Sequence, residues 1–191
     1  FLGLLFGLYT AAVVYAAGSW LEVRVPHAER PLYTAFISSA GVEEVIKFLF
    51  LFLLIWGNRN FNEPLDGIVY GVFVGLGFAW VENIIYVTHP VLGGYETALS
   101  RALLSVPGHG LFGVLMGYHM GLAKFFGKKR EVLYAFLEPY LAHGLYNEFL
   151  LEKEVTFRLL FLGLEVWLWC RAVHCIRRFL ELSPFRCISV K

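Results

Sequence analysis

The stretch Leu32–Trp56, LYTAFISSAGVEEVIKFLFLFLLIW, decides the fold, because it is long and apolar yet carries three charged residues near its centre. A helix needs about 20 predominantly apolar residues to cross the hydrocarbon core of a bilayer, and this run is long enough. Each central acidic or basic residue costs roughly 2.5–3.5 kcal/mol on insertion scales. Glu43, Glu44 and Lys47 therefore come close to cancelling the hydrophobic drive of the segment.

Helical geometry predicts how these three charges are arranged. Glu43 and Lys47 are four residues apart, and we expect them to pair along one helix face. Glu44 lies about 100° round the helix from Glu43, and we expect it to have no local partner. An unpaired carboxylate inside a membrane is by default a candidate functional group.

The composition of the whole chain indicates an integral membrane protein. Of its 191 residues, 58% are hydrophobic, 17% are aromatic and only 16% are charged, whereas soluble domains carry about 25% charged residues. The mean hydropathy is +0.64. A formal net charge of +1 argues against a nucleic-acid partner.

Apolar segments separated by short polar breaks predict an all-α, polytopic transmembrane bundle of about six helices in one domain, residues 1–191. In lipid only helices and closed barrels satisfy their backbone, and runs of this length favour helices. The expected segments are 1–21, 32–56, 67–87, 98–126, 131–150 and 155–179.

The loop lysines and arginines predict the orientation of the bundle, because cytoplasmic loops carry an excess of them. The predicted connections and ends divide these residues ten to five. The larger group, expected in the cytoplasm together with the C-terminus, is Arg59, Lys124, Lys128, Lys129, Arg130, Arg171, Arg177, Arg178, Arg186 and Lys191. The smaller group, expected outside, is Arg24, Arg30, Arg101, Lys153 and Arg158.

Glycines recur every four residues in two of the predicted helices. Small residues at this spacing let two helix backbones approach closely. We interpret the two series as packing surfaces; they are Gly67, Gly71 and Gly75, and Gly113, Gly117 and Gly121.

Polar groups that a lipid-facing surface would not tolerate occur on the second to fifth predicted helices, which we expect to form the catalytic core. The predicted directions of the helices put these groups at one depth, between the midplane and the external surface. They are Glu43, Glu44 and Lys47, then Glu82, Asn83 and Tyr86, then His109, then His143 and Asn147.

Four motifs in these helices resemble those of one family. They are Glu43-Glu44-x-x-Lys47, then Asp66-Gly-Ile-Val-Tyr-Gly with Gly-Phe-Ala-Trp-Val-Glu82-Asn83-x-x-Tyr86, then Ser105-Val-Pro-Gly-His109-Gly-x-x-Gly, and His143-Gly-Leu-Tyr-Asn147. In this order they resemble the PrsW family of intramembrane proteases, which is similar to the type II CAAX prenyl endopeptidases of the same wider clan.

The resemblance implies hydrolysis of a peptide bond in a membrane-tethered protein, such as an anti-sigma factor in a signalling pathway, by an extracytoplasmic first cut. The implied catalytic residues are Glu43, Glu44, Glu82, His109, His143 and Asn147, the last of which ends the final motif. Lys47, Asn83 and Tyr86 are supporting residues. Members of the family usually have more than six helices.

Two chemistries suit these residues. Glu44, withdrawn from water, is our first choice as the general base that activates water, with His109 and His143 donating to the carbonyl oxygen and Asn147 assisting. Glu82 would orient a histidine through its ring N–H. Alternatively, His109 and His143 with Glu44 or Glu82 would form a three-ligand zinc site with an open position for water.

Other readings of the same residues remain. A CAAX-type prenyl-protein endopeptidase would open its site to the cytoplasm, a non-catalytic membrane scaffold would keep the cluster for helix assembly, and a transporter would also use intramembrane Glu and His. Asn83 suits an interhelical hydrogen bond, and Tyr86 suits an interfacial anchor. We interpret His119 and His174 as interior structural residues and Asp66 as a helix cap.

Overall fold

The computed structural model describes residues 30–91 and 93–184, and within these residues every regular element is a helix. The all-helical fold class is therefore confirmed for the described part of the chain. The expected segment 1–21 lies outside the described residues.

The charged stretch that opened the sequence analysis is one continuous helical run. It consists of α2 (Arg30–Tyr33), η2 (Thr34–Gly41), α3 (Val42–Phe50) and η3 (Leu51–Ile55), of which η2 and η3 are π-helical. The remaining elements are α4 (Pro64–Thr88), α5 (Tyr95–Ser100), the π-helical η4 (Arg101–Ser105), α6 (Val106–Phe125), α7 (Glu131–Leu151) and α8 (Val155–Leu182).

Three of the described helices are long and apolar enough to cross a membrane, namely Pro64–Thr88, Tyr95–Phe125 and Val155–Leu182. The first begins before the predicted 67–87 segment because Glu63 and Asp66 form a capping box, in which the Glu63 amide donates to Asp66 Oδ2 at 3.0 Å. Asp66 thus caps the helix as expected, from a position inside its first turn.

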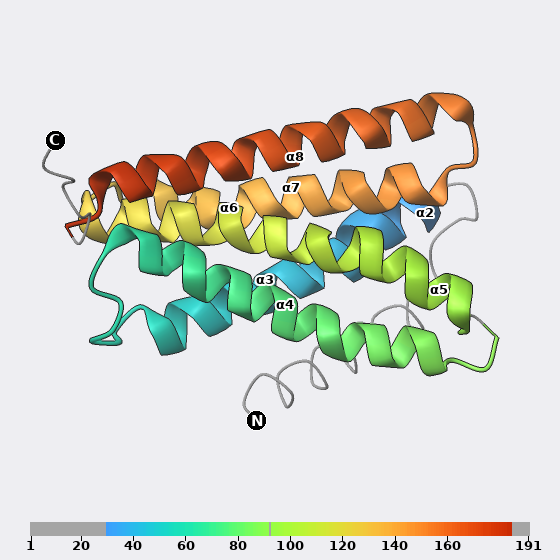
Figure 1. Ribbon diagram of the computed structural model, residues 1–191, viewed down its shortest axis with the longest axis horizontal. Helices are drawn as coiled ribbons and strands as arrows, with labels where there is room; N and C mark the ends of the chain where they lie inside the picture. The colour runs from blue at the N-terminus through green and yellow to red at the C-terminus, as the bar shows by residue number, and fades with distance from the viewer. Residues whose placement is uncertain (1–29, 92, 185–191) are drawn as a thin grey trace, which may run out of the picture.

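The long helices α4, α6, α7 and α8 lie along the long axis of the molecule, and the α2–α3 run packs against α7 (Figure 1). Helix α6 is the centre of the bundle, since it contacts α4, α7 and α8 and residues 111–123 are all buried. The ends of α4 and α7 and the starts of α2 and α6 therefore meet in one half of the bundle.

The two glycine series form the contact between α4 and α6. A methyl group added at Gly71 would lie 2.2 Å from the carbonyl oxygen of Gly113, and one at Gly67 would lie 2.4 Å from that of Gly117. A methyl group added at Gly75 would lie 2.3 Å from the carbonyl oxygen of His109. The packing interpretation is confirmed, and the interface fixes the height of His109 relative to α4.

We expect Gly71→Ala to destabilise the protein by at least about 1–3 kcal/mol, the usual cost of overpacking, because its methyl group would meet backbone that cannot rotate away. Gly77 is the matched control on the same helix, where a methyl group would meet no atom within 4 Å. Gly77→Ala should leave the midpoint of detergent-induced unfolding unchanged or raise it slightly. Equal midpoints for the two variants would contradict this packing.

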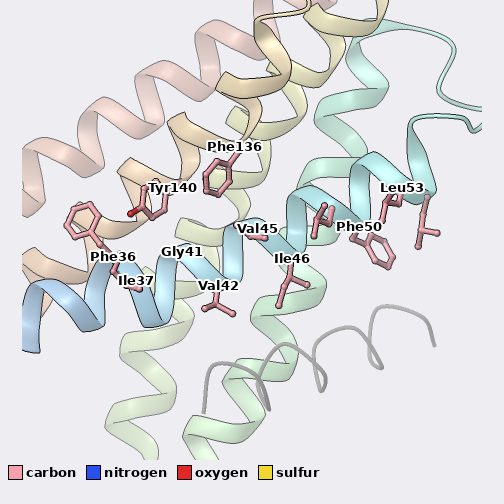
Figure 2. A pocket seen from close by; sticks show the side chains of 12 residues that line it. Phe36, Ile37, Gly41, Val42, Val45, Ile46, Phe50, Leu53, Phe136 and Tyr140 are labelled. Carbon is pink, nitrogen blue, oxygen red and sulfur yellow. The ribbon is translucent and has the colours of Figure 1, made fainter. Parts of the chain in front are cut away.

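Helix α3 has two chemically different faces. Glu43, Glu44 and Lys47 are all buried. The opposite face, with Val42, Val45 and Ile46, borders an apolar groove of about 870 Å³ that also receives side chains from α7 (Figure 2). The charged face therefore points into the bundle, and the apolar face borders the groove.

Candidate active site

Lys47 pairs with both glutamates of its helix. The expected ion pair with Glu43 is present, with Lys47 Nζ 3.8 Å from Glu43 Oε2. Lys47 Nζ also donates to Glu44 Oε1 at 2.7 Å, so the expectation that Glu44 has no local partner is wrong. The other oxygen of Glu43 is held by another hydrogen bond.

That other bond comes from Ser39, one turn before Glu43. Ser39 Oγ donates to Glu43 Oε1 at 2.9 Å and accepts a hydrogen bond from Asn147 Nδ2 at 3.0 Å. Asn147 therefore acts on the carboxylate of Glu43 through Ser39. The second oxygen of Glu43 is buried and has no hydrogen-bond partner among the described residues.

His143 is held in a defined orientation by its neighbours. Its Nδ1 lies 2.8 Å from Glu44 Oε1, and its ring stacks on Phe112 with centroids 4.7 Å apart. The other ring nitrogen, Nε2, is 4.0 Å from Glu43 Oε2. This distance is too long for a direct hydrogen bond and short enough for one water molecule to bridge.

His109 has protein partners at both ring nitrogens. Lys47 Nζ lies 3.0 Å from its Nδ1, and Glu82 Oε2 lies 2.9 Å from its Nε2. An ammonium group can only donate, so Nδ1 accepts and the ring proton on Nε2 is donated to Glu82. The predicted role of Glu82 in fixing a histidine tautomer matches this geometry. The expected hydrogen bond from His109 to a substrate oxygen does not match it, because both ring nitrogens already have protein partners.

Glu82 is shared by a second partner, Arg101. Arg101 Nη2 donates to Glu82 Oε2 at 2.7 Å, and Arg101 Nε donates to Asn83 Oδ1 at 2.7 Å. The guanidinium carbon also lies 4.1 Å from the centroid of the Tyr86 ring. Arg101 lies inside the predicted segment 98–126, but the count of loop charges does not predict that its side chain joins the cluster.

These side chains surround a polar cavity of about 310 Å³. Its wall includes Ser39, Glu82, Arg101 and His109 together with His143 and Asn147, while Tyr86, Leu104, Leu150 and Leu151 also line it. The carboxylates of Glu43 and Glu44 are not part of the wall; their hydrogen bonds reach it at Ser39 and His143. The structure thus brings predicted residues of three helices together at one cavity, namely Glu82, His109, His143 and Asn147, and places the two glutamates of the α2–α3 run behind its wall.

Four donors are close enough to share a metal ion. One ligand atom from each of Glu43, Glu44, His109 and His143 lies within 4.8 Å of the others, whereas Glu82 is not part of this group. The donor types suit zinc, but their hydrogen bonds do not. Lys47 already brings a positive charge to Glu44 and His109, and the second nitrogen of His109 is held by Glu82.

Two contributors, Ser39 and Arg101, are missing from the sequence-based set. Helical spacing is the signal that could have found them. Ser39 precedes Glu43 by four residues and Arg101 precedes His109 by eight, so each lies on the same helix face as a motif residue. The interior role assigned to His119 is consistent with the structure, where Glu131 lies 2.5 Å from its Nδ1 and Glu138 contacts its Nε2. The same expectation for His174 is wrong, because this residue of α8 is exposed.

Comparison with known proteins identifies the family. Its model, described as PrsW family intramembrane metalloprotease, matches residues 1–173. Protease PrsW of Geobacillus kaustophilus is 47% identical over 126 residues, which are 65% of this chain and 55% of that protein. Protease PrsW of Bacillus subtilis is 39% identical over 140 residues (72% and 62%), and that of Clostridioides difficile is 37% identical over 157 residues (80% and 66%).

The matched part of the chain thus spans from just over half to about two thirds of the length of these curated relatives. No solved structure matches the chain. The family model covers most of the residues, including all four motifs of the buried cluster, and the chain therefore belongs to the PrsW family.

Proposed function

We propose that the protein is an intramembrane endopeptidase that hydrolyses a peptide bond in a membrane-tethered protein, with Glu43 and His143 acting on the water molecule. The observation that carries the proposal is the pair of facing atoms, Glu43 Oε2 and His143 Nε2, 4.0 Å apart inside a buried cluster. The relatives' printed name, Protease PrsW, supports the same reaction class.

The pair divides the work of amide hydrolysis. A water molecule between the two atoms gives a proton to Glu43 Oε2 and attacks the carbonyl carbon as hydroxide. The carboxylate that takes this proton has its other oxygen held by Ser39, so the free oxygen keeps one direction. The proton then passes to the leaving amine, and the products are a carboxyl group and an amine.

Glu44 and Lys47 have supporting roles in this proposal. Glu44 accepts from both Lys47 and His143 Nδ1, and so fixes the imidazole that faces Glu43. Because Glu44 Oε1 is engaged twice, its basicity is reduced, and we transfer the role of general base from Glu44 to Glu43. His143 Nε2, the nitrogen left without the ring proton, accepts from the water molecule at the edge of the cavity in which the substrate would lie.

We further propose that the substrate is a single-pass protein resembling an anti-sigma factor, cut near the external leaflet. The cluster lies toward the end of α4 and the start of α6. With the Lys-Lys-Arg loop at residues 128–130 and the C-terminus in the cytoplasm, that half of the bundle faces outside. A CAAX-type enzyme would need the opposite opening.

We expect cleavage to survive complete removal of metal ions. The cation that a metal would supply at Glu44 and His109 is already supplied by Lys47. The purified protein, reconstituted in liposomes with a single-pass substrate, should keep its rate within about twofold after exhaustive chelation, with metal content checked by mass spectrometry. A loss of cleavage that added zinc restores would contradict the metal-free pair and favour a metal at the four donors.

A further inference from the structure

Arg101 makes hydrogen bonds to three side chains at once. Its Nε donates to Asn83, and its Nη2 donates to Glu82 and, at 3.0 Å, to Ser105 Oγ. Guanidinium donors lie in one plane at fixed angles, so three such bonds define the position of the group completely. A lysine would keep the charge but could not reproduce this fork.

The motif residues Asn83 and Tyr86 gain a common explanation from this arginine. Both lie within one turn after Glu82 on α4, and both contact the guanidinium, one at its edge and one at its face. The Arg101 side chain is only 14% exposed as a result. The second half of the α4 motif thus forms a socket for a residue of η4.

The socket is connected to the cluster through a single oxygen atom. Glu82 Oε2 accepts from Arg101 and also from His109 Nε2. His109 in turn accepts from Lys47, which donates to Glu44, the partner of His143. A change at Arg101 would therefore reach the imidazole of His143 along one continuous chain of contacts.

We propose that Arg101 is a positioning residue of this reaction: it fixes Glu82, and through Glu82 it fixes the tautomer and place of His109. The inference rests on the proposed function and adds to it a residue that lies outside all four motifs. Arg101 acts before the chemistry, on the geometry of the groups that carry it, and Asn83 and Tyr86 act on Arg101.

The test is a double-mutant cycle on cleavage in liposomes, with kcat and KM measured separately. Arg101→Leu should lower kcat by about 10–100-fold, the usual effect of losing a group that orients a catalytic ligand, and change KM less than about threefold. Arg101→Lys should restore part of kcat. In a Glu82→Gln background, Arg101→Leu should cause little further loss, because its route to His109 is already broken.

Arg158→Leu is the matched control, an exposed arginine at the start of α8 that is predicted to lie on the same side of the membrane. It should leave kcat unchanged. An active wild type with unchanged kcat in Arg101→Leu would overturn this inference alone, as would an equal fold-loss in both backgrounds. If Arg101→Leu fails to fold, a wild-type kcat in Arg101→Lys overturns it. A folded wild type that does not cleave overturns the proposed function and this inference together.

Discussion

Replacing Glu43 by glutamine should lower the rate of substrate cleavage by about 10²–10⁴-fold, the range that a general base contributes. The variant should fold normally. A glutamine amide oxygen can still accept from Ser39 Oγ, and the oxygen replaced by nitrogen makes no hydrogen bond with the described residues. The measurement is the cleavage rate in liposomes, together with the unfolding midpoint.

Two companion variants make this result specific. Glu44→Gln should lower stability as well as activity, because it removes the charge that faces Lys47 and His143. Glu148→Gln is the matched control, since Glu148 is a buried carboxylate on α7 whose Oε2 makes no hydrogen bond with the described residues. It should cleave at the wild-type rate. One outcome would show that Glu44 is the general base: Glu44→Gln abolishes cleavage without lowering stability, while Glu43→Gln still cleaves.

Replacing Lys47 by methionine should destabilise the protein by about 3–5 kcal/mol, the cost of breaking a buried ion pair from one side. Lys47 is 2% exposed and faces both glutamates. Methionine fills a similar volume, so the loss measures the uncompensated charge of the two carboxylates. The measurement is the free energy of unfolding of the purified protein in detergent.

A second substitution checks the cause of this loss. If uncompensated charge is responsible, Glu44→Gln combined with Lys47→Met should be more stable than Lys47→Met alone. Lys153→Met provides the control, because Lys153 is exposed in the connection between α7 and α8. It should change stability by less than about 0.5 kcal/mol. A Lys47→Met protein as stable as this control would mean that the carboxylates do not depend on the lysine.

The convergence of polar residues could be predicted from the sequence because it depends on depth alone. Each predicted helix fixes how far a residue lies along the bundle, and Glu82, His109 and His143 agree in that coordinate. The close approach of α4 and α6 could likewise be predicted, since glycines at a spacing of four residues give a helix a surface that another backbone can approach.

The partners of each group could not be predicted, because they depend on side chains of other helices. Lys47 has two glutamates within reach, and sequence spacing favours Glu43. Ser39 and Asn147 decide the outcome by holding Glu43 from the other side. The partners of His109 could not be predicted for the same reason. Lys47 on α3 and Glu82 on α4 occupy its two ring nitrogens, which were expected to face a substrate.

Arg101 could not be assigned to the cluster for the same reason. The predicted segment begins at residue 98 and already contains Arg101, but an arginine near a helix end is equally explained as a charge at the membrane surface. The helix begins at Tyr95, after Gly94, whose positive φ of 122° ends the preceding turn. Only the packing against α4 shows that Arg101 contacts Glu82.

We propose that the buried cluster at one end of the bundle hydrolyses peptide bonds of membrane-tethered proteins. The most direct test is mass spectrometry of a single-pass substrate incubated in liposomes with the purified protein or with its Glu43→Gln variant. We expect two fragments whose new ends lie near the external leaflet, formed by the wild-type protein alone. An intact substrate beside folded wild-type protein, or equal cleavage by both proteins, would contradict it.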